Sequence, residues 1–226
     1  MHKISRLLDF IRDTFLVTQC TVCMKQTEKG GICSECLDVL DTAHLASKKY
    51  SFEIDGRTVN CVSVFSYEFD QVKSLVLRMK ANPDRRTFIY CASRLAGEIR
   101  ALGIEEDAVV TYVPRSNEGL RKYGFDQSQF ISRIVSDVLP FASYKKLIKR
   151  TGKSKAQKRL SGDERKENVK GKFCAAKADG TFKNIVIIDD VCTTGSSLRE
   201  CAAVLKEKYP EAEIFCVTVA KNLYRL

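Results

Sequence analysis

The sequence predicts an α/β protein in which helices flank a mostly parallel sheet, with a small cysteine-rich unit ahead of it. Beyond about residue 108, short apolar runs alternate with stretches of helical periodicity, which is typical of a parallel sheet. The run Ile185–Ile188 is continuously apolar and β-branched, as expected of a strand buried on both faces. Two Cys-x-x-Cys pairs lie close together near the beginning and stand apart from this alternation.

Composition narrows the class of protein. The chain has 226 residues, of which 44% are hydrophobic and 29% charged, so it suits one main domain with a small appendage and excludes wholesale disorder. No apolar run approaches the roughly 18–20 residues that cross a bilayer. Charges interrupt the first 17 residues, which excludes a secretory signal and favours a cytoplasmic location. In that compartment, ten cysteines indicate metal or redox chemistry rather than disulfides.

The chain is expected to contain three units. Residues 1–17 form an amphipathic helix with apolar side chains at helical spacing, 18–48 a four-cysteine unit, and 49–226 the main domain. Within the main domain, the turn dipeptide Asp55-Gly56 predicts a hairpin of 51–54 and 58–65. Helical periodicity then predicts two helices, over 69–80 and 86–102.

The second half predicts the rest of the sheet. A long polar loop occupies about 151–170. The other expected elements are strands at 108–113, 145–148, 185–188 and 214–219 and helices at 127–139 and 197–208.

Four cysteines have the spacing of a metal site. Cys20-x-x-Cys23 and Cys33-x-x-Cys36 are separated by nine residues, and two such knuckles complete a tetrahedral four-sulfur site. Zinc is the first choice of metal and an iron–sulfur cluster the alternative. Four protein ligands leave no position for water, so the site is expected to be structural. The remaining cysteines, including Cys174, are expected to be buried or half-buried, and His44 to lie on the surface.

The most informative segment joins two acids to a glycine loop. The buried run is followed by Asp189 and Asp190, and a hydroxyl-rich loop then leads directly into a helix. Ligands of open α/β sheets bind at the carboxyl ends of strands, and a helix N-terminus suits a phosphate. The acids can accept hydrogen bonds from vicinal sugar hydroxyls. The segment therefore predicts a sugar-phosphate site with a loop of Val191, Cys192, Thr193, Thr194, Gly195, Ser196 and Ser197.

Two other interpretations of this segment fit the residues less well. A nucleoside triphosphatase needs a GxxxxGK[ST] loop, but the residue five before Gly152 in Gly152-Lys153-Ser154 is Leu147, which excludes it. An ordinary strand followed by a helix capped by Thr194 or Ser196 needs one hydroxyl, whereas here four hydroxyls, a glycine and two acids converge.

The net charge of +10 is concentrated in one region. Residues 143–172 hold twelve basic and three acidic side chains. Such a concentration indicates a polyanionic ligand, either nucleic acid or a polyphosphate, or else a solvated loop.

Several motifs together resemble one family. The run Asp189–Ser197 resembles the phosphoribosyl-pyrophosphate (PRPP) motif of type I phosphoribosyltransferases. The segment from Val113 to Gln127 resembles the VP…R…RGFNQ signature of the ComF family, also called the competence-protein F family. A Q-x-x-L…R…N segment and a four-cysteine zinc unit belong to the same family, so the resemblance covers about residues 5–222. Tyr123 and Asp126 depart from it, because the family usually has Arg and Asn there.

The resemblance implies a type I phosphoribosyltransferase-like sheet and assigns roles to residues. Asp189 and Asp190 would be the catalytic pair on the ribose hydroxyls, directly or through Mg²⁺, and the loop 191–197 would bind the 5′-phosphate. Pro114, Arg115, Ser116 and Lys80 would lie near the pyrophosphate. The basic loop would form a hood over the site or a nucleic-acid contact, through Lys153, Lys155, Gln157, Lys158, Arg159, Arg165 and Asn168.

Two classes of function follow from the resemblance. One is a phosphoribosyltransferase that acts in natural competence and DNA uptake on an unknown acceptor. The other is a non-catalytic single-stranded DNA-binding factor that PRPP or a nucleotide regulates. Competence machinery proteins would be partners in either case.

Overall fold

The computed structural model describes residues 18–27, 30–45, 49–81, 83–151, 171–178 and 180–222. The expected helix at 1–17 and nearly all of the basic loop lie outside these residues. The first elements are β1 (Thr18–Gln19), β2 (Gln26–Thr27), α2 (Ser34–Leu45), β3 (Lys49–Ile54), β4 (Arg57–Ser66), α3 (Asp70–Ala81), α4 (Arg85–Ala101) and β5 (Ala108–Tyr112). They are followed by α5 (Asn117–Tyr123), α6 (Gln127–Val138), β6 (Ala142–Tyr144), β7 (Ile148–Arg150), β8 (Phe173–Ala175), β9 (Asn184–Cys192), α8 (Ser196–Lys208) and β10 (Glu213–Lys221).

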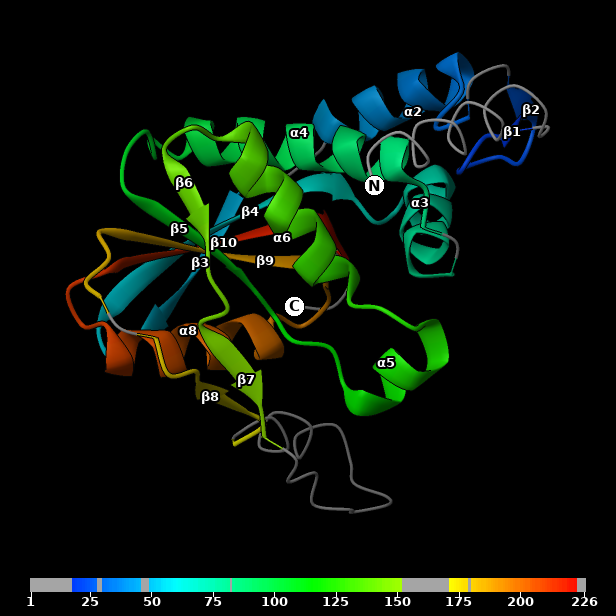
Figure 1. Cartoon of the computed structure of the whole chain (residues 1–226). Helices are drawn as coiled ribbons and strands as arrows, with labels where there is room; N and C mark the ends of the chain where they lie inside the picture. Colours follow the sequence, from blue (N-terminus) through cyan, green and yellow to red (C-terminus); the bar gives the residue numbers. More distant parts are fainter. Residues whose placement is uncertain are drawn as a thin grey trace, which may run out of the picture.

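A six-stranded sheet in the order β3-β4-β10-β9-β5-β6 forms the centre of the molecule (Figure 1). All neighbouring pairs are parallel except β3–β4, which is the predicted hairpin. The register places Asp189 of β9 beside Thr218 of β10. Because β9 lies between β10 and β5, its carboxyl end opens where neighbouring parallel strands also end.

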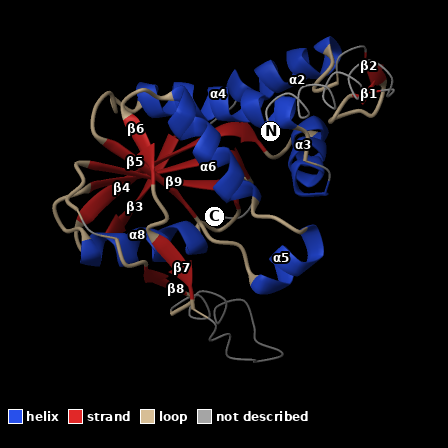
Figure 2. Ribbon diagram, in the orientation of Figure 1, coloured by secondary structure: helices blue, strands red, loops and turns tan. Residues whose placement is uncertain are grey.

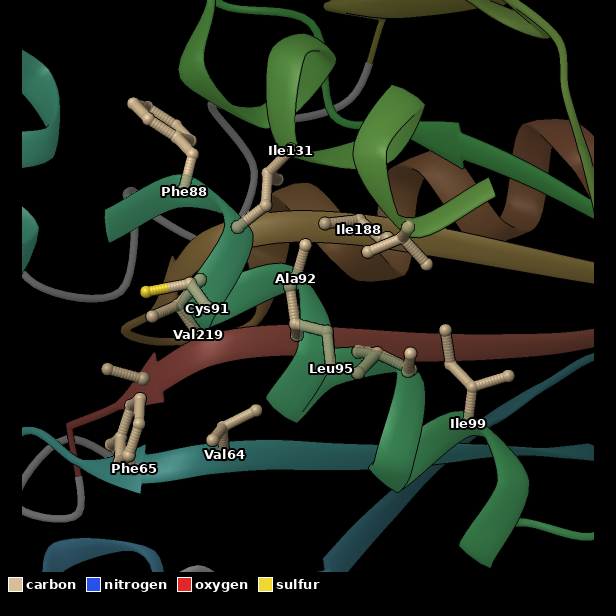
Figure 3. Packing of buried hydrophobic residues seen from close by; sticks show 14 of the residues in the cluster. Val64, Phe65, Phe88, Cys91, Ala92, Leu95, Ile99, Ile131, Ile188 and Val219 are labelled. Atoms are coloured by element: carbon tan, nitrogen blue, oxygen red, sulfur yellow. The ribbon is translucent and has the colours of Figure 1, made fainter. Parts of the chain in front are cut away.

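Helices cover both faces of the sheet (Figure 2). On one face, α2, α3, α4 and α6 enclose a core with the strands, to which α4 contributes Phe88, Cys91, Leu95 and Ile99 (Figure 3). On the other face, α8 and the small β7–β8 ribbon enclose a second core. Ile185–Ile188 have no exposed surface, because side chains that alternate along β9 reach both cores.

Capping residues determine where two of these helices begin. The Asp84 carboxylate accepts a hydrogen bond of 2.9 Å from the Thr87 amide at the start of α4. The Asp126 carboxylate accepts bonds from the Ser128 and Gln129 amides at the start of α6, as expected of an N-cap side chain. Asp126, one of the two departures from the signature, is thus the N-cap of α6.

Three local expectations were wrong. Residues 145–147 are irregular and join two short strands, β6 and β7, where one strand was predicted at 145–148. The apolar character of Leu147 suggested a strand, but this residue is buried in the core without belonging to one. Cys174 is exposed, because it lies on the outer side of β8. His44 is half-buried, because its ring packs edge-to-face with Phe65, and its Nε2 lies 2.8 Å from the Glu98 carboxylate.

Candidate functional site

The acid pair at the end of β9 is held by side chains from two helices. The Ser128 hydroxyl at the start of α6 donates a 3.1 Å hydrogen bond to Asp189 Oδ1. The Gln127 amide donates to Asp190 Oδ2, and the Lys80 ammonium at the end of α3 lies 3.0 Å from the same oxygen. Lys80, predicted from the resemblance, is therefore brought to the acids, over a separation of more than a hundred residues.

Burial makes the two carboxylates electrostatically unequal. Burial and the neighbouring Asp190 carboxylate raise the pKa of Asp189 well above its usual range, against hydrogen bonds from the Asp190 amide and Ser128. Asp190, by contrast, has the Lys80 ammonium as a direct partner. The two neighbouring carboxylates repel each other, and a bound cation or bound hydroxyl donors would relieve that repulsion.

The raised pKa of Asp189 predicts that Asp189→Asn stabilises the free protein. A carboxyl group whose pKa is raised in the folded state keeps a proton that the unfolded chain releases, so stability falls as pH rises above about 4 through the folded-state pKa. We expect the variant to gain about 1 kcal/mol of unfolding free energy at pH 7.5 and little at pH 4, measured by urea unfolding. Asp137→Asn, at an exposed carboxyl of α6 away from the acid pair, is the control. A less stable Asp189→Asn protein at pH 7.5 would contradict the expectation.

The glycine loop, Val191–Ser197, joins the acids to α8. Its Gly195 is the N-cap of α8 with a φ of 71°, a conformation that favours glycine, and has no side chain with which to cap the helix. The loop and Asp189 line a small pocket of about 50 Å³. Thr193 and Thr194 are exposed, and the Thr194 and Ser196 hydroxyl oxygens lie 2.7 Å apart. Amides and hydroxyls that meet at a helix N-terminus can bind an anion.

The segment after β5 keeps its backbone beside β9, but the side chains of Arg115 and Ser116 are engaged in contacts away from the acid pair. The Val113 amide donates to the Ile188 carbonyl, which keeps the segment beside β9. The Arg115 guanidinium, however, lies 4.4 Å from the centre of the Tyr123 ring and donates to the Phe125 carbonyl. Ser116 caps α5 by accepting from the Gly119 amide. Tyr123, where the family usually has Arg, thus provides the ring on which Arg115 stacks.

Two contacts of the acid pair were missed from the sequence. Gln127 and Ser128 were not among the predicted site residues, yet both reach the carboxylates from the first turn of α6. Gln127 closes the segment that resembles the family signature, which was the available signal; Ser128 had none. The predicted hood residues, Lys153 to Asn168, lie outside the described part of the chain.

The four cysteines form the second candidate site. Cys20, Cys23, Cys33 and Cys36 bring their sulfur atoms within 4.8 Å of one another. The Val22 and Cys33 amides donate to Cys20 Sγ at 3.4 and 3.3 Å. Burial raises the pKa of Cys20, but backbone amides, including those of Cys23 and Cys33, outweigh it and lower the pKa to about 7. Four sulfur donors in this arrangement fit a metal such as zinc.

Polar contacts attach the cysteine unit to the main domain. The Thr21 and Thr87 hydroxyl oxygens lie 2.7 Å apart, between the unit and the start of α4. Gly31 approaches Arg86 so closely that a Cβ there would lie 3.3 Å from the Arg86 Cβ. Cys20 and Cys36 belong to the same core as the sheet. The unit is therefore packed against the domain.

In the described part of the chain, no helix has the length and apolar character needed to span a membrane.

The sequence matches a known protein family model and two curated proteins. Residues 119–226 match the family model of the phosphoribosyl transferase domain. Competence protein F of Haemophilus influenzae is 28% identical over 121 residues, which cover 53% of this chain and 52% of that protein. Competence protein ComFC of Bacillus subtilis is 24% identical over 160 residues, which cover 71% of this chain and 63% of that protein. The chain thus spans about half to two thirds of the length of these curated relatives.

Two solved phosphoribosyltransferase structures were also matched. Adenine phosphoribosyltransferase from Saccharomyces cerevisiae matches with a TM-score of 0.40 at 16% identity, over 82% of this chain and 89% of that one. Orotate phosphoribosyltransferase from Aeropyrum pernix matches with a TM-score of 0.34 at 16% identity, over 82% and 93%. The chain thus contains a segment that matches the phosphoribosyl transferase domain, is similar to two competence proteins and has a four-cysteine cluster ahead of that segment.

Proposed function

We propose that this protein binds PRPP together with Mg²⁺ and transfers or senses its phosphoribosyl group. The observation that carries the proposal is the acid pair beside a glycine-started helix, with Lys80 and Gln127 on Asp190. The acids provide acceptors for the two ribose hydroxyls. The loop 191–197 provides donors for the 5′-phosphate. The cysteine site holds its metal, which we infer to be zinc, in a structural role.

The residues divide the work of a phosphoribosyl transfer. As a nucleophile attacks the anomeric carbon, the bond to pyrophosphate breaks and positive charge develops on the ribose, close to Asp189 and Asp190. Mg²⁺, when bound, neutralises charge on the pyrophosphate and the carboxylates. The backbone of Pro114–Ser116 would face the leaving group, and Arg115 would have to leave the Tyr123 ring to reach it. Lys80 can exchange its contact with Asp190 for one with the pyrophosphate.

The names of the two relatives suggest that this activity serves competence, and we propose that it does so in DNA uptake. The discriminating experiment measures pyrophosphate release from PRPP and Mg²⁺, with and without single-stranded DNA. Release that needs an acceptor identifies a transferase. Binding of PRPP without release, under every acceptor tested, favours a sensing role, and no binding of PRPP contradicts the proposal.

A second candidate is a single-stranded DNA-binding factor without catalysis, and the β7–β8 ribbon favours it. Lys145, Lys146, Lys149 and Arg150 are all exposed around this ribbon. The Lys145 ammonium and the Arg150 guanidinium each lie 5.1 Å from an aromatic ring, those of Phe182 and Phe173. Phe173 is buried and Phe182 packs against the second core, so the rings hold the two cations in place and the exposed cations provide contacts for the phosphates of a strand.

Replacing Lys153, Lys155, Lys158 and Arg159 by Ala separates the two roles of the basic loop. A DNA-binding role predicts weaker binding to all single strands and a salt slope reduced by about 0.7 for each phosphate that is no longer neutralised, with little change in PRPP affinity. A hood predicts the reverse. We expect the larger effect to be on DNA binding, because a strand can engage many cations and one pyrophosphate only a few.

The control carries Ala at four exposed basic residues elsewhere, Lys49, Arg57, Arg100 and Lys183. It matches the change in net charge and should bind DNA almost as the parent does. If the loop variant binds single strands with the parent's salt dependence, the charge of the loop does not serve DNA.

A further inference from the structure

A buried lysine on β10 lies beside the start of the glycine loop. Lys221 ends β10, and its side chain is buried, with only 4% of the residue exposed. Its Cα is paired in register with that of Cys192, the second residue of the loop. The Asn222 amide also donates to the Cys192 carbonyl at 3.0 Å. The end of β10 therefore supports the loop at the point where the loop leaves the sheet.

An aromatic ring stabilises this buried charge. The Lys221 Nζ lies 3.3 Å from the centre of the Tyr50 ring on β3. A cation over an aromatic face regains part of the hydration energy that it loses on burial, and a buried charge is otherwise costly. The ammonium can thus be held in the protein interior on the α8 side of the sheet, which is the side on which the glycine loop enters its helix.

The charge of Lys221 acts on the loop itself. Burial raises the pKa of Cys192, whereas the Tyr50 hydroxyl and the Lys221 ammonium act to lower it. Cys192 lines the pocket with the other loop residues, and its Sγ would lie 3.7 Å from a Cβ on Gly195. Cys192 therefore belongs to the loop that would bind an anion and also feels the charge of Lys221.

We propose that Lys221 strengthens the binding of a phosphate dianion in the glycine loop through space, from beneath the loop and without contacting the ligand. The proposal rests on the proposed function, because it assumes that the loop binds a phosphate. A charge in the protein interior is screened far less than one in water. A dianion above Cys192 is attracted by the ammonium in addition to the amides at the start of α8. Lys221 is thus a positioning charge of the phosphate subsite.

The test compares Lys221→Met with the parent protein by calorimetry. The probes are ribose 5-phosphate, a dianion at pH 7.5, and its methyl phosphodiester, a monoanion. We expect the variant to bind the dianion at least about tenfold more weakly and the monoanion about threefold more weakly, because the electrostatic energy is proportional to the ligand charge. Lys183→Met, at an exposed lysine next to the amino end of β9, is the control and should bind both probes as the parent does.

The outcomes are distinguishable. Equal affinity in a folded Lys221→Met protein, or an equal loss for both probes, would overturn the proposal and leave PRPP binding standing. If the parent itself binds neither probe nor PRPP, the proposed function fails and this inference with it. Should Lys221→Met not fold, Lys221→Arg and Lys221→Gln replace it, and the proposal requires the Arg variant to bind the dianion more tightly than the Gln variant.

Discussion

Changing Asp189 and Asp190 together to Asn should weaken Mg²⁺-dependent PRPP binding by about 100-fold or more. Each hydrogen bond to a charged acceptor contributes about 1.5–3 kcal/mol, and the double variant removes two charged acceptors and the attraction for Mg²⁺. Asn has nearly the shape of Asp, and its Oδ1 can still accept the bonds that Ser128 and the Asp190 amide donate. The fold should therefore persist, and calorimetry with PRPP and Mg²⁺ measures the loss.

The matched control changes Glu105 and Glu106 to Gln, another adjacent pair of acids that are exposed and precede β5. This control should bind PRPP with the affinity of the parent. If the Asp189 and Asp190 double variant keeps its affinity in a folded protein, the carboxylates do not face the ligand and the phosphoribosyl interpretation is wrong.

Changing Cys20 and Cys23 to Ser should remove the metal and loosen the N-terminal unit. The pure parent protein should contain about one zinc per chain, from the four-thiolate count. Two serines cannot replace thiolate ligands, and metal binding to such small units contributes on the order of 10 kcal/mol to their folding. Elemental analysis measures the zinc, and hydrogen exchange in α2 measures the loosening. The sheet also has a core on its other face, to which the cysteine unit contributes no residue, so its strands should keep most of their protection.

Cys174→Ser is the control, because Cys174 is exposed and outside the cluster. It should retain the metal and the stability of the parent. A parent protein that is stable and contains no metal would refute the metal assignment. A chain with iron and visible absorption would instead identify the iron–sulfur alternative.

Much of the candidate site could be predicted because its signals are local. The apolar run of β9, the two acids after it and the glycine at the start of α8 are contiguous in the sequence, so they form one strand, one turn and one helix start. Likewise, the spacing of the four cysteines is sufficient to bring their sulfur atoms together, because each knuckle turns two side chains to one side. Helix α6 was predicted by its periodicity alone.

Where the sequence signal was weak, contacts between residues distant in the chain decided the structure. Residues 145–147 looked like a strand because Leu147 is apolar, but Leu147 lies in the second core without belonging to one. Its amide donates to the Thr111 hydroxyl and its carbonyl accepts from the Ala176 amide, so its backbone groups are paired outside a strand. His44 carries no pattern that reveals its partner, since Glu98 lies more than fifty residues away.

The sequence by itself determined most of the helices and central strands and the chemical character of the carboxyl end of β9. Only the tertiary structure decided which side chains meet there. Lys80 and Gln127 reach Asp190 because α3 and α6 pack on one face of the sheet, where α3 ends and α6 begins near the carboxyl end of β9. Lys221 of β10 reaches Tyr50 of β3 across β4, which lies between the two strands. Periodicity and spacing report on the nearest neighbours along the chain, whereas these contacts join residues that are distant in sequence and depend on how helices and strands pack.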